Sequence, residues 1–289
     1  MSRFERWLPV VLFLFSLITR LIIVSAAQFD GLYGQDAYAY FEYARQIAEG
    51  ELAGPFYWPL GYPMLAALFM RLTGAVPLGA QLASAITGSA IAPLVYLITR
   101  KLTPSNTHTS ILPFSAGLLA SLSGQLLQSS ISIMADAPAL FWATLSAYAL
   151  IHSDQTRQAE WLPISAASLA LAIITRWIFA GLVFPLGVFA VLSLRHSSSP
   201  NHPFTLSPRL LISLSSALVI FSLIMLPQAI FSQTSAAPVT GHGWVTNWNP
   251  LNAIRTSFDN PDGHFDYRWP PLIHYAEPLF HPFYLFPLL

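Results

Sequence analysis

Residues 7–27 read WLPVVLFLFSLITRLIIVSAA, an apolar run that contains a single charge, Arg20. A bilayer core takes about 20 apolar residues as one α-helix, so this run predicts a membrane-spanning helix. The run is too long for the apolar core of a signal peptide, and no clear cleavage site follows it. The start of the chain therefore favours a membrane protein over a soluble one.

The composition of the whole chain agrees with this interpretation. Of the 289 residues, 54% are apolar and 9% are charged, whereas an ordinary soluble domain is roughly 25% charged. Lys plus Arg and Asp plus Glu number 13 each, so no basic stripe for nucleic acid is expected. The chain has no cysteine, which excludes disulfides, thiolate metal sites and Cys nucleophiles. We predict an all-α polytopic membrane protein.

Further apolar runs predict about seven to eight transmembrane helices in one domain, residues 1–289. After Trp7–Ala27 these runs are Val76–Thr99, Ile111–Gln128, Ser132–Ile151, Trp161–Thr175, Ile178–Leu194, Leu210–Ser232 and one that begins near Leu279. The last run ends the chain and is too short to cross a bilayer, so we expect the domain to be incomplete at its C-terminus. We see no internal repeat of the kind found in many transporters.

The segment Pro59–Gly74 decides the orientation. It has an apolar part of about 12 residues and contains Arg71, which suits an interfacial helix better than a span. If it does not cross, the basic residues of the connections fall on one side, which the positive-inside rule makes cytoplasmic. These residues are Arg3, Arg6, Arg100, Lys101, Arg157, Arg195 and Arg209. The N-terminus is then cytoplasmic, and residues 28–75 and 233–276 form long external loops of a protein in the inner or plasma membrane.

The first external loop contains a candidate catalytic acid. Asp36 precedes a helical pattern in which Tyr40, Ala44 and Ile47 share one face, which predicts an amphipathic helix along the membrane surface. Asp36 has two interpretations, an N-cap of this helix or a general base at the membrane face, and the two are compatible. A second surface helix is expected after the Pro- and aromatic-rich residues 55–63.

Three further charges lie within or beside apolar runs, where ionisable groups are costly and therefore candidates for function. Asp136, at an external helix start, is either an N-cap or a functional acid. Arg176, at an external turn, either extends to the interface or holds a lipid phosphate. Arg20 either extends outward or pairs with an acid such as Asp136. Acids and arginines at one interface indicate a site for a phosphate-bearing amphiphile and a proton acceptor.

No metal or cofactor site is predicted. His242, His264 and His274 could hold a cation together with nearby aspartates, but the stretch DNPDGHFD (259–266) lacks calcium-loop spacing. A divalent cation therefore has no support from these residues. The phosphate-loop, dinucleotide, zinc-protease and serine-hydrolase motifs are all missing from the sequence, so a soluble nucleotide has no visible site.

The order of these features resembles the GT-C superfamily of integral membrane glycosyltransferases. It is most similar to the protein O-mannosyltransferase and aminoarabinose-transferase-like group, over roughly residues 1–195. The features in order are Arg20, then Asp36 ahead of Tyr38 and Tyr40, the stretch Tyr57–Pro63, the pair Arg100 and Lys101, Asp136, and Thr175 with Arg176. One departure is that Ala37 follows Asp36, where many relatives have a second acid.

The resemblance implies a GT-C-like fold and a transfer reaction on the external face. Such enzymes move a sugar from a polyprenyl phosphate to a hydroxyl acceptor on a lipid, a glycan or a protein. Asp36 would be the catalytic base, and Asp136 would be a second acid of the catalytic site that helps place the acceptor or donor. Arg176 and Arg20 would bind the donor phosphate. The aromatic residues of the first loop, Tyr38, Tyr40, Trp58 and Tyr62, would bind substrate. Partners would be the lipid donor, the acceptor and membrane lipids, with no nucleic acid.

Alternatives from other classes remain. A membrane transporter or lipid flippase would use the same intramembrane charges, but it predicts short loops on both sides and solute-dependent flux. A non-catalytic, truncated relative predicts that Asp36→Asn changes nothing. A polymerase or ligase of lipid-linked glycans would instead use a diphosphate-linked donor. Acceptor recognition by Trp244, Trp248 and Trp269 is a hypothesis from their position in the second loop.

Overall fold

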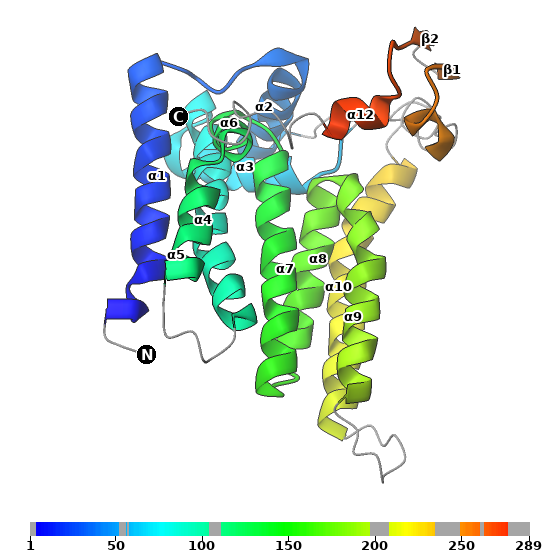
Figure 1. The fold of residues 1–289 in the computed structure, drawn as a ribbon. Helices are drawn as coiled ribbons and strands as arrows, with labels where there is room; N and C mark the ends of the chain where they lie inside the picture. Colours follow the sequence, from blue (N-terminus) through cyan, green and yellow to red (C-terminus); the bar gives the residue numbers. More distant parts are fainter. Residues whose placement is uncertain are drawn as a thin grey trace.

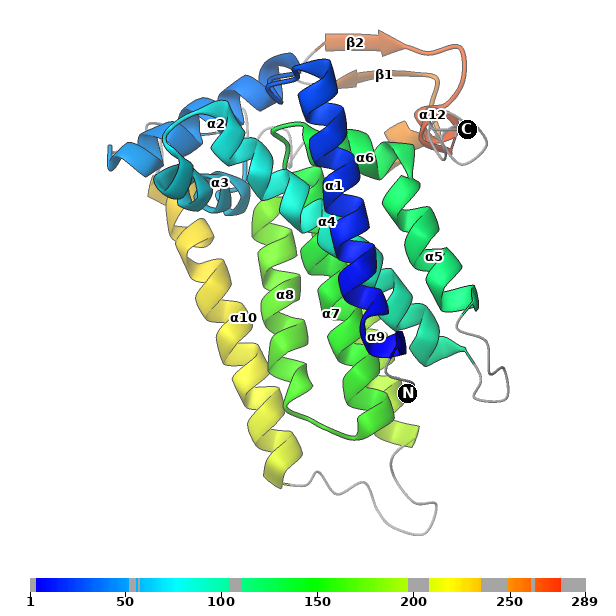
Figure 2. The same cartoon turned by 90° about the vertical axis from the view of Figure 1, so that its left-hand side faces the viewer.

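The computed structural model describes residues 4–51, 56, 58–103, 111–196, 208–234, 249–260 and 263–276. Within these residues the chain forms a bundle of long helices with shorter elements gathered at one end, which we call the cap (Figures 1 and 2). The bundle helices are α1 (Leu8–Ala27), α4 (Pro77–Leu102), α5 (Ile111–Leu122), α7 (Asp136–Thr156), α8 (Trp161–Thr175), α9 (Val183–His196) and α10 (Pro208–Thr234). The cap contains α2 (Gly34–Glu49), α3 (Gly61–Thr73) and α6 (Gly124–Ile131). The predicted all-α architecture is confirmed.

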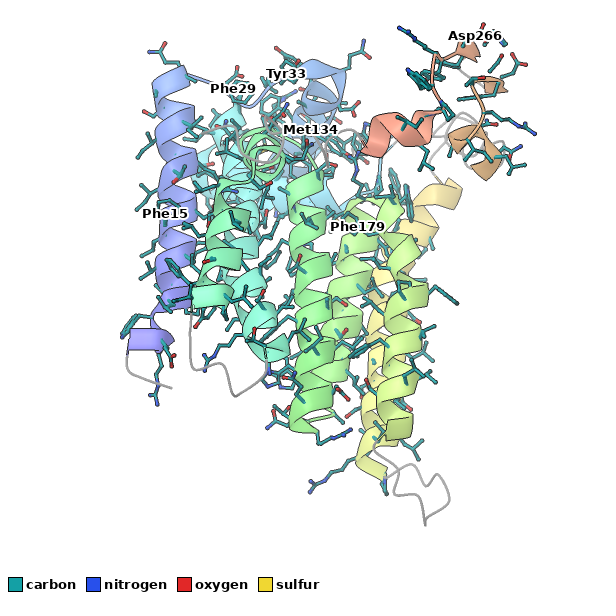
Figure 3. The ribbon with its side chains drawn as sticks, in the orientation of Figure 1. Phe15, Phe29, Tyr33, Met134, Phe179 and Asp266 are labelled. Carbon is teal, nitrogen blue, oxygen red and sulfur yellow. The ribbon has the colours of Figure 1, made fainter. Side chains whose placement is uncertain are left out.

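Three described helices are long and apolar enough to cross a bilayer, namely α1, α4 and α10. The bent pair α5 and α6 makes a fourth if it is counted as one span. Figures 1 and 2 show α7, α8 and α9 running beside these helices. Outward side chains such as Phe15 on α1 point away from the bundle, as expected for a lipid-facing surface (Figure 3). The predicted count of seven to eight spans stays a prediction, and the run from Leu279 lies outside the described residues.

Helix α4 lies at the centre of the packing, in contact with α1, α3, α5, α6 and α7. It can do so because its buried positions carry small residues, which let helix backbones approach closely in a membrane. At Gly88 a Cβ would collide with the side chain of Ser130 on α6. At Gly79 it would meet Met70 of α3 at 2.9 Å. The small residues of α4 therefore connect the bundle to the cap.

Two surface helices were predicted between the first two long helices, and both are present. Helix α2 packs on α3, and α3 packs on α4. The shared core of this part of the cap is aromatic and small, with Tyr40, Tyr62 and Ala66 almost fully buried. Gly50 ends α2 with a left-handed backbone, as the sequence pattern predicted. Helix α3 has 13 residues and lies in the cap, which supports the interfacial interpretation of Pro59–Gly74.

The predicted span Ile111–Gln128 is wrong as a single helix. The chain bends by 50° between α5 and α6. The break falls at Ser123, just before Gly124 begins α6, and both residues have weak helix preference. After it the sequence becomes amphipathic, because Leu126 and Leu127 are buried while Gln125 and Gln128 are exposed. The mean hydropathy of the whole run does not reveal this change from a uniformly apolar to an amphipathic sequence.

Other boundaries moved by a few residues. The predicted span from Ser132 begins as α7 only at Asp136, and the predicted span from Ile178 begins with a 3-10 helix, η2 (Trp177–Leu182), before α9. A short 3-10 helix, η1 (Phe4–Arg6), precedes α1.

The second long loop contains structure that the sequence analysis missed. An antiparallel hairpin joins β1 (Ser257–Asn260) and β2 (Gly263–Asp266), flanked by η3 (Pro250–Ala253) and α12 (Pro271–Ala276). The signal was present, because the residues between the strands, Pro261 and Asp262, are turn formers next to Gly263.

The basic helix ends lie opposite the cap. Arg100 and Lys101 are in the last turn of α4, Arg157 follows α7 and Arg209 begins α10. In Figures 1 and 2 all these helix ends are at the end of the bundle away from α2 and α3. The structure therefore places these four basic residues at one end of the bundle, as the predicted topology requires.

Candidate active site

Asp36 lies in the first turn of α2, where the cap meets the bundle. The helix begins at Gly34, whose φ of 79° suits glycine, and Tyr33 is the N-cap without a side-chain hydrogen bond. Asp36 is thus the third helical residue, and its interpretation as an N-cap is wrong. Among the described residues its carboxylate, which is half-buried, forms no hydrogen bond or ion pair. An acid here is favoured by the helix dipole and remains available for chemistry.

Asp136 and Arg176 form an ion pair at the same end of the bundle. The Nε atom of Arg176 lies 3.0 Å from Oδ1 of Asp136, and the two side chains are 38% and 36% exposed. Asp136 is the first residue of α7, and Arg176 follows the last residue of α8. The N-cap of α7 is Ala135, so the capping interpretation of Asp136 is also wrong. The predicted pairing of Asp136 with an arginine is real, but the partner is Arg176 and not Arg20.

Tyr40 lies within electrostatic range of both Asp36 and this ion pair. Its ring is buried between α2 and α3, and burial raises the pKa of its hydroxyl well above the usual value. The charges of Arg176, Asp136 and Asp36 all act on this hydroxyl, and the two carboxylates also interact with each other. Three charged residues from α2, α7 and the end of α8 are therefore close enough to act electrostatically on one tyrosine. We call Asp36, Tyr40, Asp136 and Arg176 the acid–arginine cluster.

The aromatic residues assigned to substrate binding divide into two groups. Tyr38 is 57% exposed and Trp58 is half-buried, so both are accessible. Tyr40 and Tyr62 are buried against each other, with ring centroids 5.1 Å apart. The Tyr62 hydroxyl donates to the Ala80 carbonyl at 3.1 Å. Burial makes Tyr40 and Tyr62 packing residues in this geometry and leaves substrate contact as a prediction for Tyr38 and Trp58.

Arg20 lies outside the acid–arginine cluster. Its side chain is fully buried, and Nη1 donates to the Ser16 carbonyl at 2.9 Å and to the Ser121 carbonyl at 3.4 Å. Ser121 is near the last residue of α5, where carbonyls lose their helical partners at the bend. Nε and Nη2 are buried without a hydrogen-bond partner in the described structure. This position favours a structural role at the bend over the predicted contact with a donor phosphate.

Two residues that the sequence analysis did not single out hold the cap in place. Gly61 begins α3, and a Cβ there would meet the Ile174 carbonyl and the Thr175 hydroxyl at 2.7 Å. Gly61 thus lets α3 rest directly on the end of α8, beside Arg176. Gln228, buried in α10, accepts a hydrogen bond from the Leu60 amide at 2.8 Å. A lone amide after Pro227 in an apolar span was the signal for Gln228.

The histidines form no metal centre in the described part of the chain, where no three potential ligands gather. His264 on the hairpin instead binds the side chain of Asp259 at 2.8 Å, and this hydrogen bond raises the pKa of the imidazole. His242 and Asp262 lie outside the described residues, as do Tyr57, Trp244 and Trp248.

The comparison with protein families gives the identity of the fold. The family model for dolichyl-phosphate-mannose-protein mannosyltransferase matches residues 10–238, which is more than three quarters of the chain. The chain belongs to this mannosyltransferase family. The predicted resemblance to GT-C membrane glycosyltransferases is therefore confirmed. No individual curated protein matches the chain.

A solved structure supports the mannosyltransferase fold. It is the S. cerevisiae protein O-mannosyltransferase Pmt1–Pmt2 complex bound to the sugar donor, with a TM-score of 0.63 at 16% sequence identity. The match covers 81% of the present chain but 34% of the yeast chain. The chain thus spans about a third of the length of this structural relative, and the likeness concerns the fold.

Proposed function

We propose that this chain transfers mannose from a polyprenyl-phosphate donor to a protein hydroxyl, with Asp36 as the general base. The observation that carries the proposal is the ion pair of Asp136 and Arg176, with Asp36 close enough to interact electrostatically with Asp136, in a chain of the mannosyltransferase family. The donor and acceptor classes follow the family's description. In this proposal the cap faces the external side of the membrane, because the basic helix ends lie opposite it.

The two acids have different surroundings, and these support different roles. Asp136 is committed to Arg176, whereas the Asp36 carboxylate has no partner among the described residues. A sugar transfer to a hydroxyl breaks the bond between the anomeric carbon and the phosphate oxygen, and it moves the hydroxyl proton to a base. We assign Asp36 to receive that proton. Asp136 then orients Arg176 and the acceptor.

Arg176 suits the leaving group. Its Nε atom is occupied by Asp136, which leaves the two terminal nitrogens of a 38% exposed guanidinium for a phosphate. Negative charge develops on the polyprenyl phosphate as the glycosidic bond breaks, and a guanidinium held in place stabilises it. Tyr38 and Trp58 are the accessible aromatic surfaces that we assign to the substrates.

The test compares the wild type with Asp36→Asn in membranes, with labelled polyprenyl-phosphate mannose and a peptide that contains serine and threonine. Loss of a general base lowers turnover by about 10²- to 10⁴-fold. Glu49→Gln is the matched control, because Glu49 is an exposed acid at the other end of α2. Thermal unfolding checks that all three proteins are folded. Equal turnover in the two variants would remove Asp36 from the reaction.

A further inference from the structure

Gln81 joins two chain segments that precede the two acids. It lies in the cap-facing part of α4 and is 3% exposed. Its Nε2 atom donates to the Phe29 carbonyl at 3.1 Å and to the Ile131 carbonyl at 2.7 Å. Both N–H groups of this amide are therefore used, one on each segment. Figure 3 shows Phe29 and Met134, one from each segment, at the cap end of the molecule.

The same two segments also bind each other directly. The Ile133 amide donates to the Gly31 carbonyl at 2.9 Å. Gly31 has a φ of 85°, and a Cβ there would meet the Ile133 side chain at 2.8 Å and Gln81 at 3.2 Å. One turn further along α4, the Ser84 hydroxyl donates to the Met134 carbonyl at 3.2 Å. We call the contacts of Gln81, Gly31 and Ile133 the interloop clasp.

The clasp lies next to both acids in the sequence. Gly31 is followed five residues later by Asp36, and Ile133 is followed three residues later by Asp136. The clasp therefore holds together the two segments that lead into α2 and α7, which are distant from each other in the sequence. Ile131 is the last residue of α6, so one of the two Gln81 hydrogen bonds goes to a helix C-terminus, where donors and cations are favoured. Phe29 lies two residues after the end of α1.

We propose that Gln81 is a positioning residue that sets the separation of Asp36 and Asp136, and through it the alignment of acceptor and donor. Gln81 does not touch the acid–arginine cluster in the described contacts, so it acts through the backbone segments that it holds. The catalytic consequence rests on the proposed function. A displacement of about 1 Å at reacting groups can reduce turnover by about 10²-fold.

The first measurement is structural and needs no substrate. The chain has no cysteine, so spin labels can be placed at Tyr33→Cys and Gln128→Cys, two exposed positions beside the two segments. Gln81→Met keeps the side-chain length but removes both donors. The label-to-label distance distribution should broaden in Gln81→Met. It should stay narrow in Gln155→Met, the matched control, because the Gln155 amide donates to the Lys101 carbonyl at the opposite end of α4.

The second measurement is kinetic. Gln81→Met should lower kcat by about 10- to 100-fold with little change in the KM for the donor, since the phosphate ligand is untouched. Gln81→Lys restores a donor near the C-terminus of α6 and should recover part of kcat and the narrow distance distribution. If Gln81→Met does not accumulate in folded form, Gln81→Asn, which withdraws the same amide by one methylene, takes its place.

The outcomes separate the two proposals. A distance distribution in Gln81→Met that matches Gln155→Met overturns the positioning role. A broadened distribution with unchanged kcat overturns it as well, since the separation would then not matter to the reaction. If the wild type turns over no donor, the proposed function fails, and the distances alone decide whether Gln81 holds the two segments together.

Discussion

The ion pair of Asp136 and Arg176 is partly open to solvent, with more than a third of each side chain exposed. Such a pair contributes little to folding, because water screens it. The ion pair instead holds the Arg176 guanidinium in a fixed place and leaves its two terminal nitrogens available to donate hydrogen bonds. A lysine at this position would keep the charge but would lose the planar fork that serves two acceptors at once.

We therefore expect Arg176→Lys to raise the KM for the polyprenyl-phosphate donor by about tenfold, the value of one charge-assisted hydrogen bond at a partly exposed site. The melting temperature should change little. Arg157→Lys, at the opposite end of the bundle, is the control in steady-state assays over a range of donor concentrations. An unchanged donor KM in Arg176→Lys would exclude Arg176 as a phosphate ligand.

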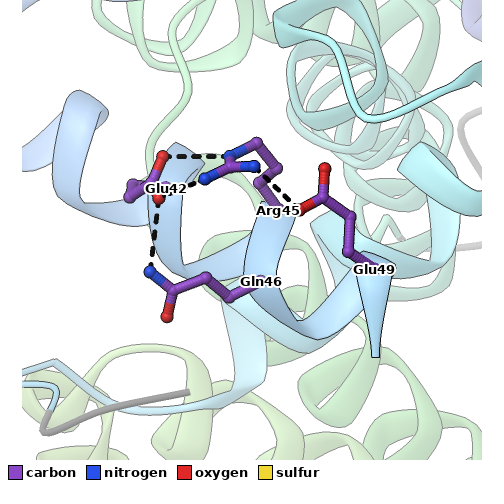
Figure 4. A network of polar contacts seen from close by, with 4 residues as sticks. All are labelled: Glu42, Arg45, Gln46 and Glu49. Atoms are coloured by element: carbon purple, nitrogen blue, oxygen red, sulfur yellow. Dashed lines mark hydrogen bonds and ion pairs between the residues drawn. The ribbon is translucent and has the colours of Figure 1, made fainter. Parts of the chain in front are cut away.

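On the outer face of α2, Arg45 binds Glu42 at 2.6 Å and Glu49 at 2.7 Å, and Gln46 also donates to Glu42 (Figure 4). The hydrogen bonds from Arg45 and then Gln46 hold the pKa of Glu42 below its usual value. A group with a lowered pKa in the folded state stabilises the fold above its ordinary pKa, about 4.3 for Glu, and loses this effect as the pH falls through the folded-state pKa.

The melting temperatures of the wild type and Arg45→Gln should therefore differ most near neutral pH. They should begin to converge as the pH falls below the ordinary Glu value of about 4.3, and the convergence should be complete only below the lower folded-state pKa of Glu42 in the wild type. Gln46→Met, which removes only the neutral hydrogen bond, should have a smaller effect at every pH. A difference between wild type and Arg45→Gln that persists at low pH would show that Arg45 acts by packing instead.

At the scale of elements, α3 is located by close backbone contacts more than by large side chains. Gly61 rests on the final carbonyls of α8, and Gln228 of α10 binds the amide just before α3 begins. At the other end of α3, Arg71 donates to the Ile47 carbonyl at 3.1 Å near the end of α2. The position of α3 thus depends on α2, α8 and α10 together.

Gly61→Ala should destabilise the protein by about 1–3 kcal/mol, because the added methyl group meets a backbone carbonyl that cannot move aside. It should also reduce turnover by shifting α3 away from the end of α8, next to Arg176. Gly187→Ala is the control, since a Cβ at Gly187 in α9 meets nothing within 4 Å. The measurement is thermal unfolding of both variants. Equal melting temperatures for Gly61→Ala and Gly187→Ala would show that α3 does not depend on close backbone contact at Gly61.

Elements with one strong signal could be predicted from the sequence. Apolar runs became α1, α4, α8 and α10, and the spacing of Tyr40, Ala44 and Ile47 predicted α2. The bend between α5 and α6 was not predicted, because an average hydropathy over Ile111–Gln128 does not register the weak helix preference of Ser123 and Gly124 or the amphipathic sequence that follows. Gln81 and Gly61 were missed because their roles come from backbone groups that are distant in the sequence.

The sequence identified the charged residues of the candidate site but not which of them pair with each other. Asp136 and Arg176 were selected because an ionisable group near an apolar run is costly. Asp36 was selected because it precedes the amphipathic helix of the first external loop. Whether Asp136 would pair with Arg20 or Arg176 depends on which helix ends meet, and the sequence alone does not specify this. The burial of Tyr40 and Tyr62 likewise follows from the packing of α2 on α3, which places one face of each helix inside the cap.

At the scale of the whole molecule, the bundle has a cap at one end and basic helix ends at the other (Figure 1). Large apolar side chains such as Ile178, Phe184 and Leu218 are each more than two-thirds exposed. In water such a surface would aggregate, but in a bilayer it faces lipid. The distribution of charge then sets which end faces the cytoplasm.

Single cysteines should reveal this orientation. An impermeant maleimide should label Tyr33→Cys and Gln128→Cys from outside intact cells, and it should label Thr156→Cys only after the membrane is opened. All three positions are exposed, and the chain has no cysteine of its own. If only Thr156→Cys were labelled in intact cells, the predicted orientation would be wrong, and the acid–arginine cluster would face the cytoplasm.

The contact of Arg20 with Ser121 also has a consequence for biogenesis, since 101 residues separate the two in the chain. At a synthesis rate of about 5–20 residues per second, the first helix waits roughly 5–20 s before the Ser121 carbonyl has been made. An arginine near the centre of a lone helix costs about 2.5–3.5 kcal/mol on insertion, and each Leu, Ile, Val or Phe offsets about 0.3–0.6. The many apolar residues of α1 therefore let the nascent helix leave the translocon while its guanidinium is bound only to Ser16 of the same helix. A substitution that weakens this helix can lower the yield of protein from the ribosome even when the finished fold would tolerate it.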